Sequence, residues 1–143
     1  MTDVVVTQSQ AETEAVGRAF ADSLGPGAVV LLSGELGAGK TAFVRGMAAG
    51  LGIDPGEVSS PTFTLVHEYR GGRLVLRHVD LYRLAPHEVE DLGLDEMALE
   101  PGVLALEWPD RLPRPIADAV SVTIDHGADD RRTITIDRRY SDR

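Results

Sequence analysis

The clearest chemical pattern in the sequence is the octapeptide GELGAGKT at Gly34–Thr41, which matches G-x-x-x-x-G-K-[ST]. Glycines in such a loop let successive backbone N–H groups turn toward an anion. Lys40 is expected to reach the β- and γ-phosphates of a nucleotide, and the hydroxyl of Thr41 to bind Mg²⁺. The predicted nucleotide-binding residues of this loop are Glu35, Leu36, Gly37, Ala38, Gly39, Lys40 and Thr41.

Lysine occurs nowhere else in the chain: Lys40 is the single lysine among 14 basic residues. An ammonium group is a compact point charge, whereas a guanidinium group is a wide planar fork. We therefore infer that position 40 uses lysine for the shape of its charge. GTPases of the P-loop class usually carry an Asn-Lys-x-Asp motif, and this chain has no asparagine. ATP is therefore the expected nucleotide.

Two acidic residues that end apolar runs, Asp80 and Glu107, are the predicted partners of the loop. In α/β sheets, ligands bind at the carboxyl ends of the strands, and Mg²⁺ on a nucleotide takes carboxylate oxygens there. Hydrolysis of ATP requires positioning, charge neutralisation and an oriented water more than covalent chemistry. Asp80 and Glu107 could divide metal binding and water positioning, with Lys40 as the catalytic cation. Their position alone does not assign these roles, and it is also consistent with solvated acids.

Other polar residues give weaker predictions. Thr62, in the segment Ser60–Thr62, either contacts Mg²⁺ or the γ-phosphate, or belongs to an ordinary turn that enters a strand. The four histidines lack the spacing of a metal site and are expected to be structural or surface residues. They are His67, His78, His87 and His126.

The elements that must position the loop follow from the hydrophobic pattern. An unbroken apolar run at Ala28–Ser33 predicts a buried strand before the loop, and a helix is expected after it at Lys40–Leu51. A first helix is predicted at Gln10–Leu24, with Ser9-x-x-Glu12 as its capping box. The predicted apolar face of that helix is Ala15, Val16, Ala19, Phe20 and Leu24.

The remaining pattern predicts a mixed sheet. Strands are expected at Val4–Thr7, Thr62–Tyr69, Arg73–Leu81, Val103–Glu107, Ala119–Asp125 and Thr133–Asp137, and short helices at Pro86–Leu92 and Leu94–Leu99. The order of strand, glycine-rich loop and helix is the context that a P-loop needs. The predicted fold class is α/β, P-loop NTPase-like, with a small mixed β-sheet flanked by helices in a single domain over residues 1–143.

Composition narrows the classes of function. The absence of cysteine excludes disulfides, thiolate metal sites and cysteine nucleophiles. The net charge of −9 disfavours direct binding of nucleic acid, because contacts with phosphates need Lys and Arg. The N-terminus lacks a secretory signal, and the longest aliphatic run, Ala28–Leu32, is too short to cross a bilayer. A cytoplasmic protein without a membrane partner is therefore expected.

Five motifs together resemble one family, the TsaE (YjeE) ATPases that support threonylcarbamoyladenosine modification of tRNA. The motifs are GELGAGKT (Gly34–Thr41), SPTFTL (Ser60–Leu65), HVDLYR (His78–Arg83), GLDE (Gly93–Glu96) and EWPD (Glu107–Asp110). The resemblance extends from about Val4 to Asp137. A P-loop alone is common to many families, whereas this succession of motifs is specific.

The resemblance assigns roles that the spacing leaves open. It implies that Thr41 and Glu107 bind Mg²⁺ and that Asp80 is needed for hydrolysis of ATP. It also implies that the start of the first helix, near Ser9–Thr13 and including Gln10, and the final turn, near Asp130–Arg131, lie beside the nucleotide. The neighbour of Glu107 in the same motif, Trp108, is expected to pack at the site or at a partner surface.

The resemblance also implies partners. Members of this family act with the TsaD and TsaB subunits, and TsaD transfers the threonylcarbamoyl group to adenosine 37 of tRNA. This chain is then expected to hydrolyse ATP within the TsaD–TsaB assembly, to reset or drive its turnover. Its acidic charge fits a protein partner better than direct contact with tRNA.

Two alternatives remain at the level of sequence. A small-molecule P-loop kinase would need a lid that bears arginine, and Arg83, Arg111 or Arg114 could serve one, although 143 residues leave little room for it. A nucleotide-binding module that docks without hydrolysis would differ by its lack of turnover with all partners present.

Overall fold

The computed structural model describes residues 2–35, 39–58, 66–82 and 84–138, which form seven strands and four α-helices. The strands are β1 (Thr2–Thr7), β2 (Ala28–Ser33), β3 (Val66–Tyr69), β4 (Leu76–Asp80), β5 (Val103–Glu107), β6 (Val120–His126) and β7 (Arg132–Arg138). The helices are α1 (Gln10–Ala21), α2 (Lys40–Gly50), α3 (Pro86–Asp91) and α4 (Leu94–Leu99), with 3₁₀ turns η1 (Pro55–Glu57) and η2 (Pro109–Arg111). None of these described helices combines the length and apolar character needed to cross a membrane.

The strands join one sheet in the order β1-β7-β6-β2-β5-β4-β3. The central strands β6, β2, β5 and β4 run parallel. By contrast, β7 pairs antiparallel with β6 and β1, and β3 pairs antiparallel with β4. The mixed sheet confirms the predicted fold class. Because parallel neighbours point the same way, β2, β5 and β4 bring their last residues to one edge of the sheet.

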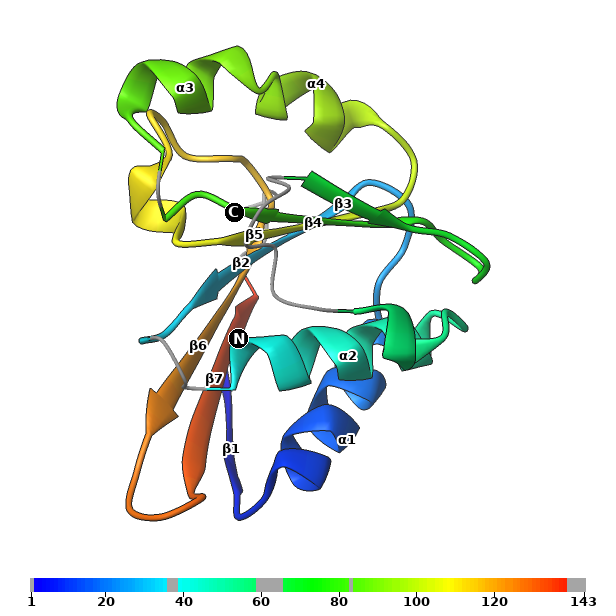
Figure 1. The fold of residues 1–143 in the computed structure, drawn as a ribbon, viewed down its shortest axis with the longest axis vertical. Helices are drawn as coiled ribbons and strands as arrows, with labels where there is room; N and C mark the ends of the chain where they lie inside the picture. Colours follow the sequence, from blue (N-terminus) through cyan, green and yellow to red (C-terminus); the bar gives the residue numbers. More distant parts are fainter. Residues whose placement is uncertain (1, 36–38, 59–65, 83, 139–143) are drawn as a thin grey trace.

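Helices cover both faces of the sheet (Figure 1), with α1 and α2 on one side and α3 and α4 on the other. Successive side chains of a strand point to opposite faces. Val30 and Leu32 of β2 therefore enter the core beside α1 and α2, whereas Val29 enters the core beside α3 and α4. Strand β2 is an unbroken apolar run because neither of its faces meets water.

Helix α1 begins where predicted, but it ends at Ala21 rather than Leu24. Its predicted apolar face is partly wrong, because Ala15 and Ala19 are exposed. The residues that α1 buries are Thr13, Gly17, Phe20 and Ala21. The buried face is shifted because Gly17 lets the backbone of α1 contact α2 directly, while Phe20 packs against Phe43 of α2.

Three glycines set the close approach of α1 to α2. A Cβ atom at Gly17 would lie 2.3 Å from the backbone oxygen of Phe43, and one at Gly46 would lie 2.0 Å from that of Glu14. A Cβ atom at Gly50 would likewise lie 2.5 Å from a backbone oxygen of α1. Real Cβ atoms essentially never come this close, so only glycine lets the two helix backbones touch.

Ser9 fixes the N-terminus of α1, since its Oγ accepts a hydrogen bond from the backbone N–H of Glu12 at 3.1 Å. The carboxylate of Glu12 accepts a hydrogen bond from the backbone N–H of Gln8 at 2.7 Å. The predicted capping box would instead use the backbone N–H of the next residue, Ser9. These bonds satisfy two backbone donors and hold the first turn of α1, which begins at Gln10.

The hairpin of β3 and β4 is shorter than predicted. Strand β4 begins at Leu76 rather than Arg73, because the backbone N–H of Arg73 donates to the carbonyl of Leu51, after the end of α2, at 2.7 Å. The first part of the other predicted strand, Thr62–Leu65, lies outside the described residues. The other predicted strands and short helices are present with ends shifted by two residues at most.

Replacing Gly46 with alanine is expected to destabilise the protein by about 1–3 kcal/mol, because the added methyl group would clash with the backbone of Glu14. Helix propensity alone predicts that the variant would be more stable, since alanine is favoured over glycine in a helix by about 1 kcal/mol. Urea denaturation measures the free energy of unfolding. Gly25→Ala is the matched control, because a Cβ atom there meets nothing within 4 Å. A Gly46→Ala variant as stable as the wild type would contradict this packing.

Candidate functional site

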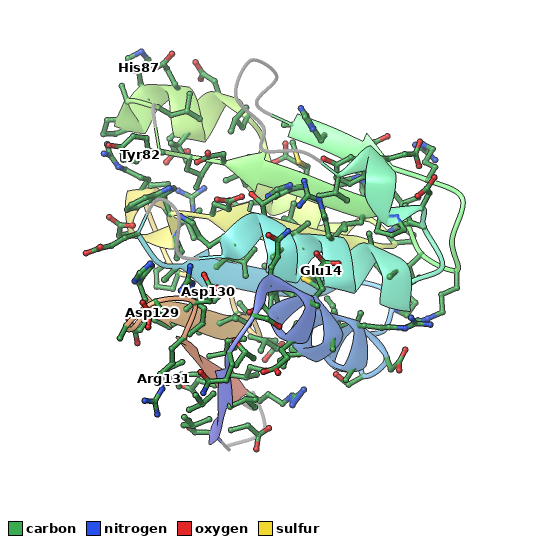
Figure 2. The ribbon with its side chains drawn as sticks, turned by 60° about the horizontal axis from the view of Figure 1, so that its bottom comes forward. Glu14, Tyr82, His87, Asp129, Asp130 and Arg131 are labelled. Carbon is green, nitrogen blue, oxygen red and sulfur yellow. The ribbon has the colours of Figure 1, made fainter. Side chains whose placement is uncertain are left out.

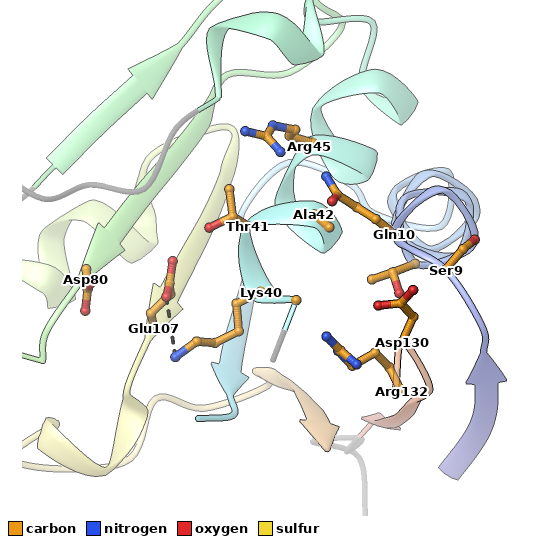
Figure 3. Close-up of a pocket in the computed structure, with 12 residues that line it drawn as sticks. Ser9, Gln10, Lys40, Thr41, Ala42, Arg45, Asp80, Glu107, Asp130 and Arg132 are labelled. Atoms are coloured by element: carbon orange, nitrogen blue, oxygen red, sulfur yellow. Dashed lines mark ion pairs between the residues drawn. The ribbon is translucent and has the colours of Figure 1, made fainter. Parts of the chain in front are cut away.

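A cavity of about 340 Å³ opens where the parallel strands end beside the N-terminus of α2 (Figure 3). One side of it is lined by Lys40 and Thr41 of α2 together with Asp80 of β4 and Glu107 of β5. The other side is lined by Ser9, Gln10, Asp130 and Arg132. Segments from both ends of the chain therefore meet the predicted phosphate-binding residues at one cavity.

Helix α2 begins at Lys40 without a side-chain cap. Its N-cap, Gly39, has a φ of 106°, a left-handed conformation that favours glycine. The first backbone N–H groups of a helix have no partner within the helix and carry the positive end of its dipole. Because Gly39 through Ala42 line the cavity, this end of α2 suits an anion.

The ammonium group of Lys40 is buried at the bottom of this arrangement, with 5% of the residue exposed. Its Nζ lies 3.6 Å from Oε1 of Glu107 and 4.1 Å from the ring centroid of Trp108. Among the described residues, Nζ has no hydrogen-bond partner. A buried cation is costly unless charge and hydrogen bonds compensate it. Lys40 thus keeps N–H donor capacity that no hydrogen bond with the described residues uses, and that an anion can satisfy.

Glu107 lies between two basic side chains. Its Oε2 lies 2.5 Å from Nε2 of His78, and its Oε1 faces Lys40. Burial acts to raise the pKa of Glu107, but the hydrogen bond with His78 and the positive charge of Lys40 outweigh it and hold the pKa below its ordinary value. Glu107 is therefore ionised at neutral pH.

Asp80 lies beside Glu107 in the register of β4 and β5, and the two acids differ in environment. Burial is the main cause that raises the pKa of Asp80, and the negative charge of Glu107 adds to it. The hydrogen bond that the backbone N–H of Tyr82 donates to Oδ1, at 2.9 Å, acts in the opposite direction. Neighbouring acids whose pKa values are pushed apart are typical of divided roles at a site.

Trp108 lies next to Lys40. It has a φ of 62°, which is uncommon for a residue other than glycine. Its ring packs at a tilt against Tyr82 with centroids 4.7 Å apart, and its backbone N–H donates to the carbonyl of Leu32 at 3.2 Å. Backbone strain of this kind gathers at functional sites. Trp108 thus packs beside Lys40, which agrees with one of the two places expected for it.

The predicted site residues do not all reach the cavity. Gln10 and Asp130 line it, but Arg131 does not, and its neighbour Arg132 does. Figure 2 shows Asp129, Asp130 and Arg131 together at the turn before β7. Glu35 is exposed. Leu36, Gly37 and Ala38, the segment Ser60–Thr62 and Arg83 lie outside the described residues.

Sequence reasoning missed three residues at or beside the cavity. Arg45 lines it four residues after Thr41, which is the spacing of one helix face. His78 is two residues before Asp80, and the period of a strand places both on one face. Arg132 gave no such local signal, because its place depends on where the hairpin of β6 and β7 ends.

Residues 7–134 match the family model described as "Threonylcarbamoyl adenosine biosynthesis protein TsaE". The chain belongs to the TsaE family. The tRNA threonylcarbamoyladenosine biosynthesis protein TsaE of Bacillus subtilis is 44% identical, over 90% of this chain and 81% of the relative. The TsaE of Treponema pallidum is 42% identical, over 92% and 97%. The crystal structure of Bacillus subtilis YdiB has a TM-score of 0.75 at 35% identity, covering 95% of this chain and 84% of its own.

Replacing Glu107 with glutamine is expected to lower the pKa of Asp80. The change removes a negative charge that raises this pKa and leaves Lys40 without its ion-pair partner. An acid titration followed by the ¹³C chemical shift of the Asp80 carboxyl group measures the pKa directly. Glu57→Gln, an exposed change in η1, is the control and should leave it unaltered. An Asp80 pKa that stays the same or rises in Glu107→Gln would show that the two carboxylates are not coupled.

Proposed function

We propose that this protein is a Mg²⁺-dependent ATPase that supports N6-threonylcarbamoyladenosine modification of tRNA at adenosine 37. One observation carries the proposal. The buried ammonium of Lys40, the uncapped N-terminus of α2 and two strand-end carboxylates line one cavity in a chain of the TsaE family. A cavity that joins anion-binding groups to acids suits a nucleotide with its metal ion.

The phosphates of ATP would lie against the N-terminus of α2. Lys40 would donate to the β- and γ-phosphates, because its Nζ is buried in the cavity wall without a hydrogen-bond partner among the described residues. Gly39, the last glycine of the predicted phosphate-binding loop, is the N-cap of this helix. Gln10 and Arg132, on the opposite wall, would contact the remainder of the nucleotide.

The oxygen ligands at the site fit Mg²⁺. Thr41 and the ionised Glu107 both line the cavity. Among the described residues, no group of three or more His, Asp or Glu side chains could hold a metal by itself. Mg²⁺ is usually held by one or two protein oxygens together with substrate phosphates and water. Bound by Thr41 and Glu107, Mg²⁺ would neutralise charge on the β- and γ-phosphates.

Asp80 would orient the attacking water. Its carboxylate lies at the cavity wall beside Glu107 and is not paired with Lys40, so it remains available to accept a hydrogen bond from water. Lys40 would stabilise the negative charge that develops on the phosphate oxygens. Other P-loop sites gain a stabilising residue from a partner, and TsaD and TsaB are the proposed partners here. The net charge of −9 favours indirect contact with tRNA.

Lys40→Ala is expected to weaken ATP binding at least about tenfold, because it removes the buried cation. Asp80→Ala should keep binding and lower hydrolysis by about 100-fold or more, since it removes the residue that orients water. Isothermal titration measures binding, and phosphate release measures Mg²⁺-dependent hydrolysis, alone and with purified TsaD and TsaB. Asp91→Ala, an exposed change on α3, is the control.

Stimulation by TsaD and TsaB that is lost in Asp80→Ala would support the proposal. Normal hydrolysis by Asp80→Ala within the assembly would refute the assignment of Asp80. Binding of ATP without turnover in the complete assembly would favour a docking module, and a phosphorylated small-molecule product would favour a kinase.

Arg132→Ala is expected to weaken ATP binding about tenfold, whereas Arg131→Ala should change it little. Arg132 lines the cavity and Arg131 does not, although the two side chains carry the same charge. Comparison of the two dissociation constants at one salt concentration separates contact from net charge. Equal losses in the two variants would indicate a general electrostatic effect instead of a contact.

A further inference from the structure

His78 is a completely buried histidine whose contacts lead into the candidate site. It lies in β4, on the same face of the sheet as Asp80. Its register partner in β5 is Ala105, and its Nε2 reaches Oε2 of Glu107, two residues further along that strand, at 2.5 Å. His78 itself does not line the cavity, so it acts on the site through Glu107.

The two ring nitrogens of His78 have different environments. Nε2 has the carboxylate of Glu107, whereas Nδ1 is buried without a hydrogen-bond partner among the described residues. An unpaired buried N–H group is costly. The arrangement therefore favours the tautomer with its proton on Nε2, where it donates to Glu107.

The two oxygens of Glu107 are divided between two neighbours. Oε2 is held by His78, and Oε1 is 3.6 Å from the ammonium of Lys40 at the cavity wall. Without a donor at position 78, the carboxylate would be free to rotate and to engage Lys40 with both oxygens. The oxygen that faces the cavity would then no longer have a fixed direction.

We propose that His78 is a positioning residue, whose Nε2–H fixes Oε2 of Glu107 and keeps Oε1 directed into the cavity as a metal ligand. The inference rests on the proposed function, which makes Glu107 a ligand of Mg²⁺. Hydrogen-bond partners of metal-binding side chains orient them, and their loss typically weakens metal affinity by about 10–100-fold. His78 would therefore contribute to metal binding rather than to nucleotide binding.

The test compares His78→Leu, which removes the donor, with His78→Gln, whose amide N–H can take the place of Nε2–H. Isothermal titration of ADP at increasing Mg²⁺ gives the half-saturating Mg²⁺ concentration, and titration in EDTA gives the metal-free affinity for ADP. His78→Leu is expected to raise the half-saturating Mg²⁺ concentration about 10–100-fold. His78→Gln should restore it to within about threefold of the wild type, and the metal-free affinity should change less than about threefold in both variants.

The control is His87→Leu, a change at an exposed histidine on α3 (Figure 2), which should leave Mg²⁺ dependence unaltered. Wild-type Mg²⁺ dependence in His78→Leu, or an equal loss in His78→Leu and His78→Gln, would overturn the positioning role. So would a parallel loss of metal-free ADP affinity, which a merely structural role predicts.

Glu107→Gln separates this inference from the proposed function. If Glu107→Gln leaves the Mg²⁺ dependence unchanged, the metal site itself is wrong and both proposals fall. If Glu107→Gln weakens Mg²⁺ binding and His78→Leu does not, only the role of His78 falls.

A measurement on the wild-type protein covers the case in which His78→Leu does not fold. Nitrogen-15 NMR of the histidine rings at neutral pH identifies which nitrogen of His78 carries a proton. A protonated Nε2 supports the inference, and an Nε2 without a proton overturns it.

Discussion

Parallel pairing of β2, β5 and β4 brings the end of β2 and two carboxylates to the same edge of the sheet. In this register Leu32 lies beside Glu107, and Glu107 lies beside Asp80. Side chains at the ends of three strands thus converge although they are far apart in the sequence. A shift of one residue in β5 would turn Glu107 to the opposite face and leave Lys40 buried without its counter-ion.

Buried ionisable side chains determine the chemical properties of this edge of the sheet. Lys40, His78 and Glu107 are all buried, and each would be costly there without the others. Such groups are weak evidence for stability, because well-packed apolar side chains often serve that purpose as well. Their arrangement is better explained by the state of the site that it maintains. Glu107 is ionised beside Asp80, whose pKa is raised, and the ammonium of Lys40 has unused donors.

The other wall of the cavity depends on backbone contact between α1 and α2. Gly17 and Gly46 allow the two helices to touch, and this contact brings Ser9 and Gln10, at the start of α1, next to the start of α2. The cap at Ser9 then fixes the first turn of α1. The glycines of the helix interiors therefore shape the site without lining it.

The sequence by itself determined the P-loop pattern with Lys40 and the strand and helix on either side of it. It also determined Asp80 and Glu107 as strand-end acids. These features depend on spacing and on the local hydrophobic pattern. Only the tertiary structure decided the contact of His78 with Glu107, the place of Arg132 rather than Arg131 at the cavity, and the contact of α1 with α2 at Gly17. These features depend on strand order, register and helix crossing. Strand order and helix crossing bring residues as far apart in the sequence as Gln10 and Arg132 to one cavity, which no local pattern can predict.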